Sequence, residues 1–303
     1  MSHHTPLSSL PCLRLSGVTL LAAAVVGGCA HAPSPEGPPA TEVVWALTAD
    51  HTLLRIQAGQ PQHVQKSLAL KGLPAGEQLV GMDFRVAKGV LFALGRTGQL
   101  YTLNTETGQL QPVGQSLQAV ALTGVRWGVD FNPAADRIRV VSDSGHNLRY
   151  HPDTGGVVDF DAQQPGVQAD PSLRFAAGDT QFGQPPRVVA AAYTYNTRDE
   201  KITTNFAIDA RLGTLVMQGS REGVTPVESP NLGVLRTVGT LGGGPLVDAA
   251  FDIADVKNTA LAALRTQADP VTRLYRIDLL TGQARPLGAL AAGQPVVGLA
   301  IEP

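Results

Sequence analysis

The polar residues best suited to recognising a ligand concentrate in one segment, "DRIRVVSDSGHNLRYHPDTG", residues 136–155. Around a single turn it carries Arg139, Asp143, Asn147 and Arg149. Arginine and asparagine between two strands can recognise a carboxylate, a phosphate or a sugar through paired donors. The competing interpretation is a solvated hairpin whose Asp, Ser, Gly and Asn residues only form the turn, and we favour it. The four residues are kept as ligand-binding candidates.

Aspartates recur at one place in a repeated phrase. Asp83 lies in "GMDFRVAKGVLFALGR", Asp130 in "GVDFNPAADRIRVVSD" and Asp252 in the shorter "AAFDIAD". A ring of such carboxylates could hold a cation. However, a residue that recurs with a repeat usually serves the repeat, here by accepting backbone hydrogen bonds, and we favour that role. Asp83 and Asp130 remain ligand-binding candidates, and no metal site is predicted.

Sequence signatures of catalysis are missing from the chain. It has no Gly-x-Ser-x-Gly elbow, no Cys-x-x-Cys and no Gly-x-x-x-x-Gly-Lys phosphate loop. His146 and His151 do not have the spacing of a zinc site, and no further histidine follows them. We therefore assign no catalytic residue and expect no cofactor.

The elements that must position these side chains are repeated β-hairpins. "YTLNTETGQLQPVG" from Tyr101 and "YRIDLLTGQARPLG" from Tyr275 share Tyr, Thr, Gly, Gln, Pro and Gly in place. Each is predicted to form two strands joined by a tight turn. Three looser copies give five hairpins, whose turn glycines are Gly59, Gly108, Gly155, Gly213 and Gly282.

The spacing of the hairpins indicates an all-β propeller. The first steps, from position 59 to 108 and from 108 to 155, match the roughly 40 to 50 residues of one four-stranded blade. The longer later steps contain insertions, so we predict five blades, or six if the segment near Leu235 forms its own sheet. A β-sandwich is the alternative with less support, because the repeated phrase holds a fixed place before each turn.

The two ends of the domain are predicted to complete one composite blade. The first hairpin lacks an opening strand before "VVWALTAD" at Val43, whereas "VVGLAI", Val296 to Ile301, is an opening strand with nothing after it. Pairing of these segments would close the ring and remove free sheet edges.

Composition and the first 41 residues concern partners and cellular address. The net charge of −2 offers no basic surface for nucleic acid. Residues 1–28 read as a lipoprotein signal peptide: a short apolar run ends in "VGGCA", and lipidation is predicted on Cys29. Residues 29–41 form a Pro-rich tether and residues 42–303 a single domain. We expect a lipid-anchored protein of the cell envelope, at the outer membrane.

The central phrase from Gly128 to Gly155, with "VVAAAYTYN" and "LYRIDLLTGQARPLG", resembles the bacterial secreted family catalogued as domain of unknown function 4394. The resemblance covers Val43 to Pro303 and implies an extracytoplasmic, propeller-like domain without assigned activity. Asn147, Arg149, Asp153 and Gly155 match its central motif.

Together these observations predict a binding or scaffold module for an envelope protein or a small ligand. The alternative is an extracytoplasmic hydrolase or lactonase at the mouth of the channel, because propeller enzymes assemble dispersed carboxylates, Asn and His there. In that alternative Asp130 or Asp83 would act with Asn147 and Arg149.

Overall fold

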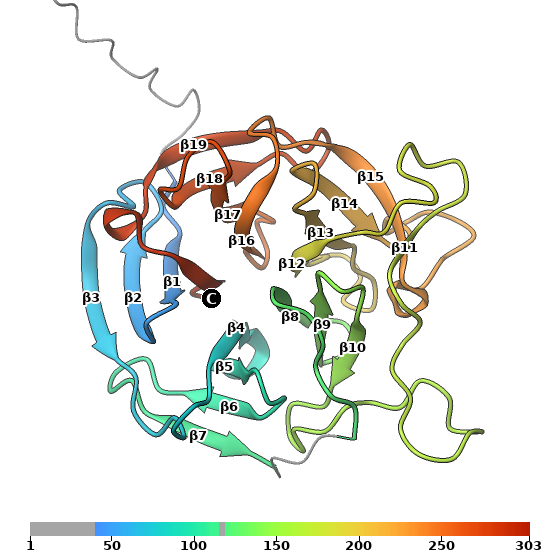
Figure 1. Cartoon of the computed structure of the whole chain (residues 1–303), viewed down its shortest axis with the longest axis horizontal. Helices are drawn as coiled ribbons and strands as arrows, with labels where there is room; N and C mark the ends of the chain where they lie inside the picture. The colour runs from blue at the N-terminus through green and yellow to red at the C-terminus, as the bar shows by residue number, and fades with distance from the viewer. Residues whose placement is uncertain (1–39, 115–118) are drawn as a thin grey trace, which may run out of the picture. The chain divides into compact units, whose positions relative to one another are not determined.

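The repeated hairpins form five β-sheets arranged around a central axis (Figure 1). They are seen in a computed structural model, which describes residues 40–114 and 119–303. The prediction of an all-β, five-bladed propeller is confirmed. The segment near Leu235 belongs to the fourth blade rather than to a sixth. The signal peptide, Cys29 and the tether up to residue 39 lie outside the described residues.

Each blade is numbered from its innermost strand outward. Blade 1 consists of β20 (Val296–Ile301), β1 (Val43–Thr48), β2 (Thr52–Gln57) and β3 (Val64–Ala69). Blade 2 consists of β4 (Leu79–Arg85), β5 (Val90–Gly95), β6 (Leu100–Leu103) and β7 (Leu110–Val113). Blade 3 consists of β8 (Trp127–Asn132), β9 (Arg137–Ser142) and β10 (Asn147–Tyr150). Blade 4 consists of β12 (Val188–Tyr193), β13 (Asn205–Asp209), β14 (Thr214–Gln218), β15 (Val234–Thr240) and β11 (Arg174–Phe175). Blade 5 consists of β16 (Leu246–Ile253), β17 (Ala260–Thr266), β18 (Arg273–Ile277) and β19 (Ala284–Ala289).

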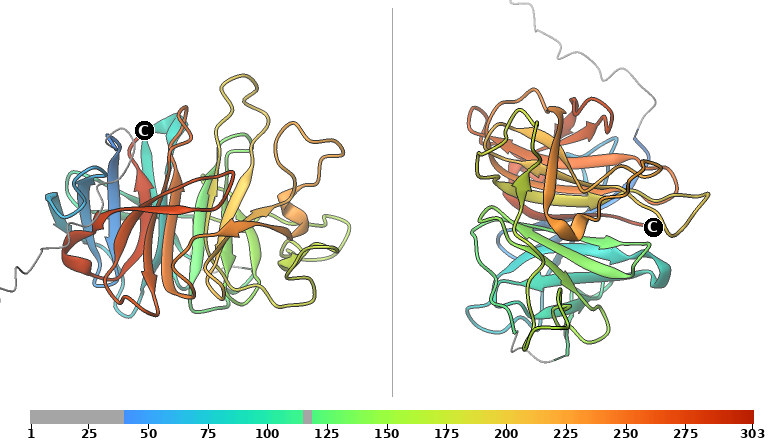
Figure 2. Two further views of the ribbon diagram at one scale, coloured as in Figure 1. Left: turned by 90° about the horizontal axis from the view of Figure 1, so that it is seen from above. Right: turned by 90° about the vertical axis from the view of Figure 1, so that its right-hand side faces the viewer.

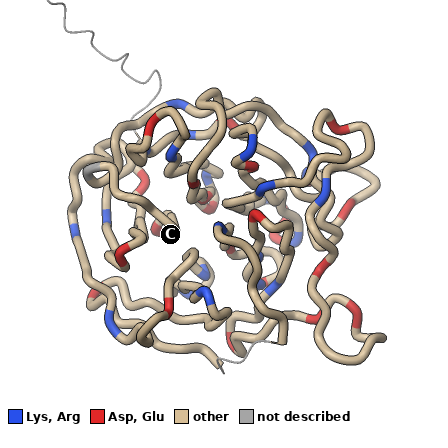
Figure 3. Tube along the Cα trace, viewed as in Figure 1, with Lys and Arg blue, Asp and Glu red and all other residues tan. Residues whose placement is uncertain are grey.

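Helical structure in the described residues is limited to short 3₁₀ turns at Val86–Lys88, Pro230–Leu232 and Ala291–Gly293. Within residues 40–114 and 119–303, none of these turns has the length and apolar character needed to cross a bilayer. Charged residues of both signs are spread around all five blades (Figure 3).

The ring closes through the composite blade that the sequence predicts. β20 pairs antiparallel with β1, with Trp45 opposite Ala300 and Ala46 opposite Leu299. Beyond the strand, Glu302 accepts hydrogen bonds from the Trp45 indole and from Arg55, each at 3.0 Å. The last residues of the domain therefore fix its first strand, and the sheet has no open inner edge.

Alternation along each strand builds the cores between the blades. Side chains of a strand point in turn to opposite faces of its sheet. On β1, Val44 and Ala46 pack in the cluster between blades 1 and 5, whereas Trp45 and Leu47 pack in the cluster between blades 1 and 2. Equivalent clusters fill the other three interfaces. The strands therefore have two buried faces, which explains their nearly continuous apolar character.

Small residues narrow the central channel at mid-height. The inner strands present Gly81, Gly128, Ala191, Ala250 and Gly298 around a cavity of only about 10 Å³. A Cβ added at Gly128 would lie 2.5 Å from the backbone nitrogen of Ala191. This waist separates a cavity at the C-terminal ends of the inner strands from one at their N-terminal ends.

The fourth hairpin differs from the prediction in its place within the blade. Gly108 and Gly282 lie between the third and fourth strands of their blades, but Gly213 lies between β13 and β14, the second and third strands of blade 4. Its resemblance to the other hairpins reflects shared turn chemistry, since all three glycines have positive φ. The loop of residues 194–204, which precedes β13, rises from the same side as the end of β20 (Figure 2, left).

Candidate functional site

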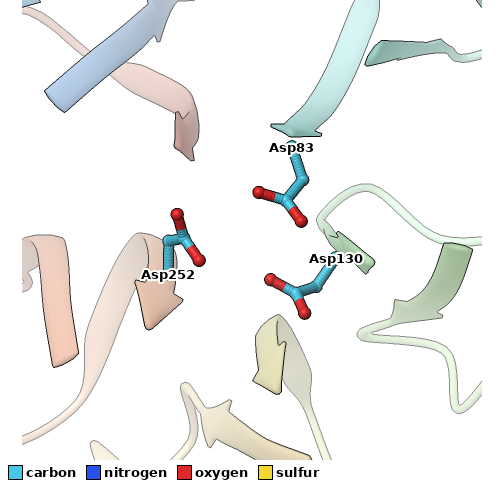
Figure 4. A group of neighbouring side chains, drawn as sticks. All are labelled: Asp83, Asp130 and Asp252. Carbon is cyan, nitrogen blue, oxygen red and sulfur yellow. The ribbon is translucent and has the colours of Figure 1, made fainter. Parts of the chain in front are cut away.

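Three aspartates converge near the axis from three different blades. Asp83 on β4, Asp130 on β8 and Asp252 on β16 are all buried, and one carboxylate oxygen of each lies within 4.8 Å of the others (Figure 4). Inner strands that start at the same height and run in the same direction place equivalent residues on one ring. The recurrence in the sequence therefore becomes an acidic cluster in space.

Each carboxylate also links its blade to the next one. Asp83 Oδ2 accepts from the backbone N–H of Phe131 at 2.7 Å, and Asp130 Oδ2 accepts from that of Tyr193 at 2.8 Å. Asp252 Oδ2 accepts from the N–H of Ile301 at 2.6 Å. The structure thus contains the backbone-accepting arrangement that we favoured for these residues.

The same pattern locates the two blades without an aspartate. Each donor follows, by one position, the equivalent place in the next strand: Phe131 follows Asp130. By this rule Ala192, before Tyr193, and Ala300, before Ile301, hold the place in blades 4 and 1. The ring therefore has three carboxylates and two methyl groups, and the small alanines leave space beside the acids.

Burial keeps the three acids from ionising freely. Loss of water is the largest cause that raises the pKa of Asp83 and of Asp130 well above the usual range, followed by the charge of a neighbouring aspartate. Burial raises the pKa of Asp252 to about 7. Near neutral pH the cluster therefore retains protons, and a ligand that supplies donors or positive charge would replace them.

The cluster lies at the base of a cavity of about 500 Å³ at the C-terminal ends of the inner strands, here called the mouth chamber. This volume is within the range of small-molecule sites. Its polar walls include Glu200 and Asp255, and burial raises the pKa of Asp255 to about 6. Its aromatic and apolar walls include Phe84, Phe131, Tyr193, Tyr195, Ile253 and Ile301.

An arginine clasp and a strained turn form part of the chamber rim. Arg85 donates from Nε to Asp136 at 2.8 Å and also pairs with Asp153, so its charge is already neutralised. Val256, which is exposed, has a φ of 64°. This backbone conformation is rare and costly for a β-branched residue.

Three of the other predicted residues form an internal network instead of an open site. Arg139 is buried and donates to Tyr193 Oη at 3.1 Å, to Asn147 Oδ1 at 2.7 Å and to Asp170 Oδ2 at 2.7 Å. Arg149 binds both oxygens of Asp170. These contacts attach the insertion that carries Asp170 to blade 3.

The polar network is nevertheless close to the mouth chamber. Arg139 and Arg149 line a neighbouring cavity of about 220 Å³, which shares Asn132 and Tyr193 with the chamber. Asn147 lines neither cavity; its Nδ2 donates to carbonyls of the 229–232 turn and to Pro171. Of the predicted ligand-binding residues, Asp83 and Asp130 alone line the chamber.

Asp143 has a local role at the opposite end of blade 3. Its Oδ1 accepts from the backbone N–H of Val125 at 2.9 Å and more weakly from that of Arg126. This is the turn chemistry that the sequence indicated for the segment.

The sequence interpretation did not select Asp255, Glu200 or Tyr195 as site residues. Asp255 follows Asp252 by three positions in "AAFDIAD", where the carboxylates continue the repeated phrase. Glu200 and Tyr195 are supplied by a long loop that has no counterpart in the other blades. Repetition could therefore have indicated Asp255, but not the loop residues.

The fold and the chamber define a five-bladed β-propeller with an acidic cluster in its channel. Residues 52–300 match the family described as "Domain of unknown function (DUF4394)", and the chain belongs to this family. No curated protein matches it.

Two solved structures are similar in arrangement. One is a nidogen/laminin complex, 10% identical over 86% of this chain and 98% of that chain, with a TM-score of 0.44. The other is a structural genomics protein of unknown function from Bacteroides thetaiotaomicron, 14% identical over 81% of this chain and 57% of that chain, with a TM-score of 0.45.

Proposed function

We propose that the protein is a lipid-anchored binding module of the cell envelope that takes a small ligand into the mouth chamber. One observation carries the proposal: three buried carboxylates converge at the base of a cavity large enough for a small molecule. The family match is consistent with it, since it assigns no activity. The sequence of residues 1–29 supports the anchor and the address.

The chamber walls favour a ligand that presents hydrogen-bond donors, above all a positively charged amine. Asp83, Asp130, Asp252, Asp255 and Glu200 all offer acceptors, whereas the charge of Arg85 is satisfied by Asp136 and Asp153. A cation above an aromatic face gains further attraction, and the apolar walls would contact the rest of the ligand. Nucleic acid is not an expected partner, because the net charge is −2.

Calorimetric titration with amine probes tests the binding proposal. Putrescine and ethanolamine should bind the purified domain, and the Asp83→Asn and Asp130→Asn variants should each weaken binding at least tenfold. Asp143→Asn is the matched control, because Asp143 lies outside the chamber, and should leave the affinity unchanged. Absence of binding at millimolar amine, or equal binding by all variants, overturns the proposal. Binding of Ca²⁺ in place of the amines would overturn the ligand class.

A hydrolase is the second candidate, and the acid–base properties of the chamber favour it. Asp252, with a pKa of about 7, can hold a proton near neutral pH beside other carboxyls. Groups with separated pKa values can serve as acid and base in hydrolysis. Hydrolysis of aryl esters and lactones that disappears in both Asp130→Asn and Asp252→Asn would support this candidate. A rate equal to that of buffer would remove it.

The anchor is tested separately in cells. Cys29→Ala should move the protein from the outer-membrane fraction to the soluble extracytoplasmic fraction. Retention in the membrane fraction would show that the lipobox interpretation is wrong, without affecting the ligand proposal.

A further inference from the structure

A second cavity, here called the distal cavity, lies at the N-terminal ends of the inner strands. Its volume is about 200 Å³. Residues at the starts of β4, β8 and β20 form its wall together with turns of blades 1 and 2. The waist separates it from the mouth chamber, and the two cavities have no lining residue in common.

Positive charge dominates the distal cavity. Arg96, Arg126 and Arg265 line it, against Asp248 as its one acidic lining residue among those described. Arg126 Nε lies 3.0 Å from Asp248 Oδ2, and Arg265 Nη2 lies 3.8 Å from the same oxygen. One carboxylate is therefore shared by two guanidinium groups.

Arg96 is held by an aromatic ring rather than by an acid. Its guanidinium carbon lies 5.7 Å from the centroid of the Trp127 ring, and no acidic residue of the described chain pairs with it. Stacking on an aromatic face orients a guanidinium while leaving its N–H groups free to donate. With Asp248 ionised, three positive groups and one negative group leave an excess of two positive charges.

Donors also exceed acceptors in this wall. Arg265 Nε and the indole N–H of Trp127 are buried, and neither has a hydrogen-bond partner among the described residues. The rest of the wall is largely apolar, with Leu79, Val80, Val125, Pro295 and Val297. An apolar wall strengthens the attraction between a guanidinium and an anion, because it excludes water from their surroundings.

We propose that the distal cavity binds a small dianion, a dicarboxylate or a phosphate monoester. The two excess positive charges match the charge of such a ligand, and planar guanidinium groups bind carboxylate and phosphate oxygens in pairs. The volume corresponds to roughly seven water molecules, which suits a compact ligand. This site is additional to the proposed function and would give the propeller one ligand at each end of its channel.

Titration calorimetry with succinate and with inorganic phosphate tests the proposal. At least one probe should bind, and preference for one of them identifies the dicarboxylate or the phosphate as the recognised group. Arg96→Gln and Arg265→Gln should each weaken binding at least tenfold. Arg96 is exposed, so its variant is expected to fold normally. Asp248→Asn should tighten binding, because it removes the competing carboxylate.

The controls separate this site from the mouth chamber and from general charge effects. Arg198→Gln removes an exposed arginine from the loop of residues 194–204 and should leave anion binding unchanged. Asp130→Asn, which tests the mouth chamber, should also leave it unchanged. Failure of both probes to bind at 10 mM, about a typical upper limit for weak sites, overturns the proposal. Equal weakening by Arg198→Gln and Arg96→Gln overturns it as well.

Discussion

The Asp252 carboxylate accepts a hydrogen bond from the backbone N–H of Ile301 at 2.6 Å, across the boundary where the ring closes. Asp252 belongs to blade 5, and Ile301 lies on the last strand of the chain, in blade 1. The same contact joins blade 2 to blade 3 and blade 3 to blade 4. One side chain therefore serves two purposes: it holds neighbouring blades together, and it places an acid at the base of the mouth chamber.

The dual role of Asp252 predicts a pH-dependent change in stability. Folding raises its pKa from the usual 3.8 to about 7, so the folded chain keeps a proton that the unfolded chain has released. The free energy of unfolding should therefore fall as pH rises from about 4 to about 7. Asp252→Asn keeps an acceptor for Ile301 and removes the charge, so it should stabilise the protein at pH 8 by on the order of 2–4 kcal/mol.

Urea unfolding at pH 5 and pH 8 measures this effect. Asp199→Asn, at an exposed carboxylate, should change the free energy of unfolding by less than about 0.5 kcal/mol at either pH. A variant Asp252→Asn that is less stable than the parent at pH 8 would show that the ionised carboxylate is needed for the closure.

The waist predicts a steric requirement for glycine at position 128. A Cβ there would lie within 2.8 Å of the backbone of Ala190 and Ala191, so adjacent inner strands would have to move apart. Gly128→Ala should lower the free energy of unfolding by about 2–4 kcal/mol. Gly156→Ala is the control, because the nearest atom to its Cβ is 3.6 Å away. Equal stability of the two variants, by thermal or urea unfolding, would mean that the inner strands do not approach this closely.

Much of the architecture could be predicted because the fold repeats. The composite blade followed from an opening strand that was missing at Val43 and present at Val296, and the observed pairing of β1 with β20 is the predicted one. The fourth hairpin was placed wrongly within its blade, because Gly213 has the same turn chemistry as Gly108 and Gly282. Turn chemistry is local, whereas the place of a hairpin in a sheet depends on distant strands.

The candidate site was only partly predictable, for the same reason. Repetition identified Asp83, Asp130 and Asp252, since equivalent places in a ring converge. It could not show that Arg139 and Arg149 are taken up by Asp170, because that residue comes from an insertion without a repeat. The distal cavity was missed altogether: Arg96 and Arg265 lie far apart in the chain and outside any motif.

The buried network predicts that Arg139 contributes mainly to stability. Removing one partner of a buried ion pair leaves the other charge uncompensated. Arg139→Met should therefore lower the free energy of unfolding by about 3–5 kcal/mol without any ligand present. Arg137→Met, on the same strand but with hydrogen bonds to nearby carbonyls only, should cost less than about 1 kcal/mol. A small effect of Arg139→Met in urea unfolding would return Arg139 to the ligand-binding candidates.

The strained backbone at Val256 gives a final prediction that connects stability with the mouth chamber. A φ of 64° costs a β-branched residue about 1–2 kcal/mol, a cost that glycine does not have. Since glycine also loses more entropy on folding, Val256→Gly should stabilise the protein by about 0.5–1 kcal/mol net. Val247→Gly, at an exposed valine within β16, should instead destabilise it. Strain of this kind persists at sites where function requires the geometry, and Val256 lines the chamber. Val256→Gly should therefore also weaken amine binding, and a variant that is more stable with unchanged binding would separate the turn from the site.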